Sequence, residues 1–170
     1  MKFWDSSAIV PLLVEEAESP LFARIYAADH DLVVWWATEV ECASALARRA
    51  RGQSGEMTGA LDRAYAQLDQ FVQRWHEVAP AHEVRQVARR LLRTHLLRAA
   101  DALQLAAALV ARGEQPVPFE FVCADDRLIA VARGEGLTIA ALDEVREPDE
   151  SSYQAIREKR RRRAGKGKTR

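Results

Sequence analysis

Four acidic residues of this chain follow segments that are predicted to be strands or lie at the start of a predicted helix. They are Asp5, Glu41, Asp101 and Asp125. An acid at the start of a helix usually caps it or interacts with its dipole, for about 0.3–1 kcal/mol, and this is the simplest interpretation of any one of them. Asp101 argues against it, because residues 98–112 are otherwise almost wholly Ala and Leu. A carboxylate buried in such a segment needs a partner.

A divalent metal ion is the partner that can serve several carboxylates at once. Arg98 or Arg127 can neutralise one acid, but no cation of the sequence is placed to serve all four. Oxygen ligands with open positions for water and phosphate suit Mg²⁺ or Mn²⁺, whereas Zn²⁺ prefers the His and Cys that are scarce here. The sequence shows no Gly-rich phosphate loop and no Ser-His-Asp or Cys-His set. It therefore disfavours a nucleotide triphosphatase and a side-chain nucleophile.

The elements that must position these acids alternate between strands and helices. The predicted strands cover residues 2–4, 32–36, 75–79, 119–123 and 137–142. The predicted helices cover residues 6–16, 19–28, 38–51, 56–74, 98–112 and 125–133, with one more after Pro80. This alternation predicts an α/β fold with a central, mainly parallel sheet flanked by helices on both sides. Functional groups of such a sheet gather outside the carboxyl ends of its strands.

Two of the helices have a predicted inward face. In residues 38–51 it consists of Val40, Ala43, Ala47 and Ala50. In the helix after Pro80 it consists of Val84, Val87, Ala88, Leu91 and Leu92. Both sets recur at the spacing of one face of a helix.

Charge divides the chain into two parts. Residues 1–147 are predicted to form one domain, and residues 148–170 a basic, disordered tail. Residues 157–170 have a net charge of +8, whereas residues 1–156 have a net charge of −8. The basic run contains Arg160, Arg161, Arg162 and Arg163. Such a run is typical of solvated disorder or of nonspecific nucleic-acid binding, and the sequence favours neither.

Composition favours a cytoplasmic protein with no membrane contact. The two cysteines are not arranged as a metal-binding pair and are too few for a disulfide framework. The longest aliphatic run, residues 105–111, is far shorter than the roughly 20 residues of a membrane-spanning helix. Asp5 and Pro11 interrupt the apolar stretch that a signal peptide needs.

Four segments carry a resemblance to a known family. They are Asp5-Ser6-Ser7-Ala8, Glu41 followed by Ala45-Leu46, Leu97-Arg98-Ala99-Ala100-Asp101-Ala102-Leu103-Gln104-Leu105-Ala106, and Val122-Cys123-Ala124-Asp125-Asp126-Arg127-Leu128. In this order, over residues 2–143, they resemble the successive motifs of PIN-domain proteins, and in particular toxins of the VapC type from bacterial toxin-antitoxin modules. The segment around Asp101 is the most specific of the four.

The resemblance implies a PIN-like fold and an endoribonuclease that depends on Mg²⁺ or Mn²⁺. The family's conserved acids correspond to Asp5, Glu41, Asp101 and Asp125. Of these, Asp5, Asp101 and Asp125 are expected to hold metal, and Glu41 to orient the attacking water or a second ion. Three further residues have supporting positions: Ser7, Glu39 and Asp126. Cys123 stands near the fourth acid, where many relatives have Thr or Ser.

The same resemblance implies partners. They are an RNA substrate, an antitoxin that covers the cleft with an Arg or Lys among the carboxylates, and a second copy of the chain in a homodimer. Leu12, Leu13, Phe22 and Tyr26 can supply the dimer interface, although core packing explains them equally well. Two other functions stay open: a nuclease acting on DNA, and a non-catalytic binding module whose acids serve as helix caps.

Overall fold

Five short strands form the centre of the computed structural model, which describes residues 1–51, 58–114 and 119–140. The strands are β1 (Lys2–Trp4), β2 (Leu32–Trp35), β3 (His76–Val78), β4 (Glu120–Val122) and β5 (Thr138–Ile139). They pair in parallel in the order β3-β2-β1-β4-β5. The predicted α/β class and parallel sheet are confirmed.

Seven helices connect the strands within the described residues. They are α1 (Ser6–Leu13), α2 (Ser19–Ala28), α3 (Thr38–Arg51), α4 (Thr58–Val72), α5 (His82–Thr94), α6 (Ala99–Glu114) and α7 (Asp126–Gly134). Each coincides with a predicted helix to within a few residues. The largest difference is α1, predicted to reach residue 16, which ends at Leu13 because Val14 has an extended backbone.

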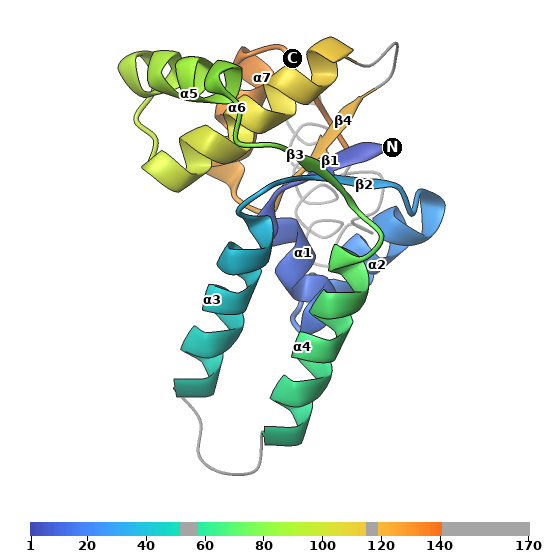
Figure 1. Cartoon of the computed structure of the whole chain (residues 1–170). Coiled ribbons are helices and arrows are strands. Elements are labelled where there is room, and N and C mark those ends of the chain that lie inside the picture. Colours follow the sequence, from blue (N-terminus) through green and yellow to red (C-terminus); the bar gives the residue numbers. More distant parts are fainter. Residues whose placement is uncertain (52–57, 115–118, 141–170) are drawn as a thin grey trace, which may run out of the picture. The chain divides into compact units, whose positions relative to one another are not determined.

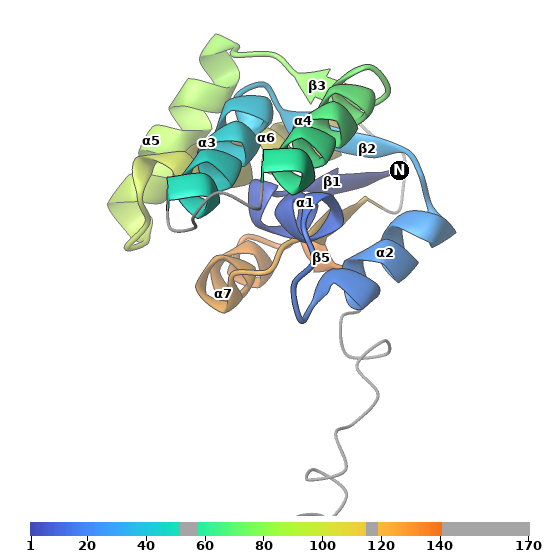
Figure 2. The ribbon, with the colours of Figure 1, turned by 90° about the horizontal axis from the view of Figure 1, so that it is seen from below.

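The connections place helices on both faces of the sheet. The chain moves outwards from β1 to β2 and then β3, so right-handed crossovers put α1 to α4 on one face. It then returns past β1 to β4 and β5, which puts α5, α6 and α7 on the other face (Figures 1 and 2). The direction in which successive strands are added to the sheet therefore reverses between β1 and β4. At such a position, open parallel sheets form a crevice at the carboxyl ends of their strands.

Burial of the sheet on both sides explains its sequence. Phe3 and Trp4 of β1 and Phe121 and Val122 of β4 have no exposed surface, as expected of a parallel sheet between two helix layers. Ala residues of α6 have no exposed surface either: Ala102, Ala106, Ala107 and Ala108. These small side chains let α6 pack closely against β2 and α5.

Two predicted helix faces need correction. Val40 is 65% exposed, and the buried residues of α3 are Thr38, Cys42, Ala45 and Leu46. The hydrophobic period was right, but it does not fix which side of the helix faces the core. Ala43 instead borders α4, where the Tyr65 hydroxyl donates to its carbonyl oxygen at 3.2 Å.

The second wrong assignment is Leu92, which is 44% exposed. Leu91 is fully buried, and one residue along a helix turns the side chain by about 100°. The buried face of α5 consists of Val84, Ala88 and Leu91, so Leu92 points out of it.

Core packing accounts for most of the residues considered for a dimer interface. Phe22 is 1% exposed and Leu13 is 7% exposed, so both belong to the interior of this chain. Tyr26 is half-buried and makes edge contacts with the rings of Trp4 and Phe71. No helix among the described residues is long and apolar enough to cross a membrane. The predicted domain boundary at residue 147 and the tail lie outside the described residues.

Candidate active site

Asp5 lies at the centre of the carboxyl edge, directly after the middle strand of the sheet. Its backbone N–H donates to the Val122 carbonyl at 2.9 Å, which ties it to β4 across the crevice. One carboxylate oxygen, Oδ2, accepts from the Ser7 backbone N–H at 2.9 Å and so caps α1. Cys123 Sγ lies 3.7 Å from the same oxygen. These contacts fix the Asp5 side chain in a buried position, where the residue is only 5% exposed.

Glu41, in the first turns of α3, is held by a residue from the opposite face of the sheet. Gln104 Nε2 in α6 donates to Glu41 Oε2 at 2.7 Å and to Thr38 Oγ1 at 3.2 Å. Gln104 is 1% exposed, and its Oε1 accepts no hydrogen bond from the described residues. A buried amide that directs both N–H groups to α3 fixes the position of the Glu41 carboxylate.

Asp101, in the first turn of α6, completes a cluster with Asp5 and Glu41. Burial raises the pKa of Asp5 from 3.8 to about 6, against the hydrogen bonds from Ser7, and the negative charges of Glu41 and Asp101 add to the rise. The Asp5 carboxylate therefore lies close enough to those of Glu41 and Asp101 to feel their charge. Among the described residues, no Lys, Arg or His forms an ion pair with any of the three.

Asp125 has a different environment. Its Oδ1 accepts from the backbone N–H groups of Arg127 at 2.8 Å and Leu128 at 3.3 Å, which caps α7. Arg127 also pairs with its Oδ2 at 3.2 Å, and this contact lowers the pKa of the Asp125 carboxyl. Asp125 stands across Cys123 from Asp5, so it borders the cluster but is already neutralised.

Beside the cluster is a groove of about 610 Å³ between α1, α3 and the start of α6. Its wall includes Ser7, Glu41 and Asp101. The same groove is lined by three arginines, Arg48, Arg49 and Arg98. Arg49 pairs with Glu16, whereas Arg48 and Arg98 have no ion-pair partner among the described residues. Acids at one end and arginines along the wall make a site that can receive an anion and hold a cation.

Of the residues predicted to support the site, Ser7 lies in it, whereas Glu39 and Asp126 do not. The Ser7 hydroxyl accepts from the Ala124 backbone N–H at 3.0 Å and lies 3.6 Å from Cys123 Sγ, so it joins α1 to the segment after β4. Glu39 and Asp126 are exposed and do not line the groove. Arg160 to Arg163 lie outside the described residues.

The donor chemistry of the cluster fits Mg²⁺ or Mn²⁺, because its ligands are carboxylate oxygens that form no ion pair within the described part of the chain. The donor positions fit less closely. Within residues 1–51, 58–114 and 119–140, no three His, Cys, Asp or Glu side chains are arranged to hold one metal ion. The two cysteines do not change this, since burial strongly raises the pKa of the Cys42 and Cys123 thiols and keeps them protonated.

The chain matches no protein-family model and no curated protein sequence.

Sequence reasoning missed the contacts that cross the sheet. Gln104 interrupts an Ala and Leu segment three residues after Asp101, which places both on one side of α6. The sequence therefore indicates that Gln104 lies near Asp101, but it does not indicate that Gln104 contacts Glu41. Trp36, the last residue of the predicted strand 32–36, lies just beyond β2 and is 53% exposed.

Proposed function

We propose that this chain is a PIN-like, metal-dependent endoribonuclease that acts as the toxin of a toxin-antitoxin pair. One observation carries the proposal: Asp5, Glu41 and Asp101 meet at the carboxyl edge of a parallel sheet, beside a groove, with no cation of the described residues paired to them. Neighbouring carboxylates that form no ion pair with the described residues are rarely present for stability alone, because the repulsion on Asp5 destabilises the fold.

The proposed reaction is hydrolysis of an RNA phosphodiester, in which water adds to phosphorus and a P–O bond breaks. Asp5 and Asp101 would hold Mg²⁺ or Mn²⁺, which would supply a water of lowered pKa and neutralise charge on the phosphate. Asp125, which borders the cluster and is paired with Arg127, is the third residue predicted for this role. Glu41, positioned by Gln104, orients the attacking water. Arg48 and Arg98 on the groove wall attract the negatively charged strand.

The partners follow from the same site. Three carboxylates that form no ion pair with the described residues are suited to an Arg or Lys of an antitoxin, which would enter the groove and block it. The homodimer is proposed on the motif resemblance alone.

The decisive experiment compares Asp101→Asn with Asp62→Asn, which removes an equal charge from the exposed surface of α4. We expect the first variant to lose cleavage of single-stranded RNA in Mg²⁺ by at least about 100-fold, because a metal-holding charge is gone, while the second keeps the wild-type rate. Circular dichroism and thermal unfolding check that both variants are folded. Undiminished turnover by purified Asp101→Asn protein would refute the proposal.

A second candidate, a non-catalytic binding module, is favoured by one observation. Asp5 and Asp125 both act as helix caps, so part of the acidic set has a structural role. Matched DNA and RNA substrates in the same assay separate the possibilities. Cleavage of DNA alone would indicate a deoxyribonuclease, and cleavage of neither would leave the binding module.

A further inference from the structure

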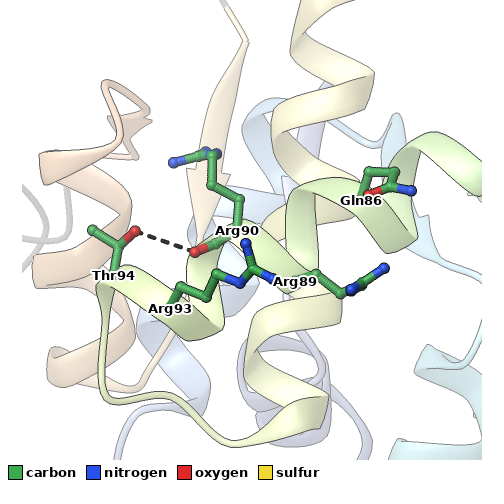
Figure 3. Close-up of a pocket in the computed structure, with 5 residues that line it drawn as sticks. All are labelled: Gln86, Arg89, Arg90, Arg93 and Thr94. Carbon is green, nitrogen blue, oxygen red and sulfur yellow. Dashed lines mark hydrogen bonds between the residues drawn. The ribbon is translucent and has the colours of Figure 1, made fainter.

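The last turns of α5 carry a cluster of arginines on the face turned away from α6. Arg89, Arg90 and Arg93, called here the α5 arginine cluster, line a hollow of about 320 Å³ together with Gln86 and Thr94. Figure 3 shows Arg93 extending along the helix towards Arg89, and Arg90 extending away from both. All three arginines are exposed, while Val84, Ala88 and Leu91 bury the opposite face.

Only one arginine of the cluster is neutralised within the described part of the chain. Arg90 donates to Glu135 Oε2 at 2.7 Å, and His95 lies 2.7 Å from the other oxygen of that carboxylate. Arg89 and Arg93 form no ion pair with any described residue. They are four residues apart, so their like charges face each other on the helix and destabilise it. The helix keeps an arrangement that costs it stability unless an anion is present.

The position of the charge is unusual for this chain. Residues 1–140 contain 15 Lys or Arg against 19 Asp or Glu, a net charge of −4. Helix α5 alone contains four arginines against one acid, Glu83. The anion that it attracts must approach an otherwise acidic body, and a concentrated basic helix supplies that local attraction.

The cluster leads to the acidic site. Arg98, which lines the groove together with Asp101, is four positions along the chain from Thr94 at the end of α5. An extended chain of four residues spans at most about 14 Å, so Thr94 of the hollow lies within about 14 Å of Arg98 of the groove. The α5 arginine cluster and Arg98 thus lie on one continuous stretch of chain that leads to Asp101.

We propose that the α5 arginine cluster binds backbone phosphates of single-stranded RNA beyond the bond that is cut. The inference rests on the proposed ribonuclease function for its substrate, and on the stretch of chain to Arg98 for its choice of RNA over an acidic protein. The contacts are guanidinium to phosphate and read no base, so they strengthen binding without selecting sequence. Arg89 and Arg93 bind the strand, while Arg90 holds the hollow in place through Glu135.

The test measures RNA binding in the Asp101→Asn background, without divalent ions, so that no cleavage interferes. The test variant is Arg89→Ser/Arg93→Ser, and the matched control is Arg63→Ser/Arg74→Ser, which removes two exposed arginines in and just after α4. The probe is a short, labelled, single-stranded RNA of mixed sequence, titrated over a series of salt concentrations.

We expect the log-log salt slope of the affinity to fall by about 1.4 in the test variant, or about 0.7 for each phosphate that an arginine no longer neutralises. At about 0.1 M salt this corresponds to an affinity roughly 25-fold weaker. The control pair should change neither value. Arg89→Lys/Arg93→Lys, which restores the charge, should restore the slope.

Equal slopes in the test variant and its parent would overturn the inference. It would also be overturned if a poly-glutamate peptide bound the cluster and RNA did not, since the partner would then be an acidic protein. Loss of RNA binding in the test variant supports the inference even if the wild-type chain cuts no RNA. Cleavage by the wild type with unchanged binding by the test variant would leave the ribonuclease standing and remove only the cluster's role.

Discussion

At the scale of single residues, Asp5 carries the most deeply buried carboxyl group among the described residues. Its pKa of about 6, against an ordinary 3.8, arises chiefly from burial, with Glu41 and Asp101 adding repulsion. The folded protein therefore binds a proton more tightly than the unfolded chain does. The free energy of unfolding from this group is largest below about pH 4 and is lost as the pH rises through about 6.

Asp5→Asn should therefore stabilise the metal-free protein, and increasingly so with rising pH. The gain should grow between about pH 4 and 6 and reach at most about 3 kcal/mol above that range. Urea unfolding in EDTA across this range measures it. Asp62→Asn, on the exposed surface, is the control and should show no such trend. A stability difference between Asp5→Asn and wild type that does not vary with pH would contradict the raised pKa.

Gln104 is predicted to act as a positioning residue through Glu41. Replacing it by Leu removes the 2.7 Å hydrogen bond that fixes the Glu41 carboxylate and should lower RNA cleavage about 10- to 100-fold. The change in the free energy of unfolding should stay at about 1 kcal/mol, because Gln104 Oε1 accepts no hydrogen bond from the described part of the chain and its removal offsets part of the cost.

Thr38→Val is the matched control for this prediction. It removes the hydroxyl that accepts from Gln104 at 3.2 Å and leaves the hydrogen bond to Glu41 in place. It should keep most of the activity and should not shift the Mg²⁺ concentration needed for half-maximal rate. A Gln104→Leu protein with the wild-type rate and Mg²⁺ dependence would show that Glu41 needs no such support.

At the scale of elements, the sequence predicted what depends on local pattern. Fully apolar runs such as residues 32–36 are typical of strands buried on both sides, and the sheet has them at the predicted places. The sequence could not predict which side of α3 is buried. Val40 and Cys42 both fit an amphipathic period, and only the neighbouring helices decide which of the two is buried. The contact of Gln104 with Glu41 joins residues 63 positions apart, which no local pattern encodes.

The end of α7 is fastened to α5 and the segment after it by Glu135. Hydrogen bonds from Arg90 and then His95 lower the pKa of Glu135 from 4.5 to about 2. A carboxyl group with a lowered pKa stabilises the fold above its ordinary value, and that contribution is lost as the pH falls from about 4.5 towards 2. The partly exposed Arg90 limits its size.

Glu135→Gln should lower the free energy of unfolding by about 1 kcal/mol at pH 7, and the difference should shrink below about pH 4.5. Chemical denaturation at neutral and acidic pH measures it. Glu83→Gln, an exposed change in α5 at a residue that forms no ion pair with the described residues, should have a smaller effect at both pH values. An equal cost for Glu135→Gln at both pH values would mean that the interaction is not ionic.

At the scale of the whole molecule, one reversal in the order in which strands are added to the sheet brings the site together. Residues of β1, α3 and α6 are far apart in sequence, yet they meet because β1 lies between β2 and β4 in the sheet. The two helix layers each contribute acids to the edge between them. The proposed site therefore exists only in the folded chain, and a ligand bound there must stabilise the fold.

Millimolar Mg²⁺ or Mn²⁺ should raise the melting temperature of the wild-type protein, because binding to the folded state alone adds RT ln(1 + [L]/Kd), about 2.7 kcal/mol when the ion is at about 100 times its Kd. Scanning calorimetry with and without the ion measures the increment. It should vanish in a variant with Asn or Gln at Asp5, Glu41, Asp101 and Asp125. An undiminished increment in that variant would place the ion elsewhere.

The exposed Trp36 gives the protein a fluorescent reporter at the carboxyl end of β2. The other three tryptophans, Trp4, Trp35 and Trp75, are at most 7% exposed, whereas Trp36 is 53% exposed directly after β2. A collisional quencher such as acrylamide will therefore reach one indole and spare three. A ligand or partner that covers the carboxyl end of β2 will shield that indole, so the quenched fraction of the emission reports coverage of this part of the sheet without any label.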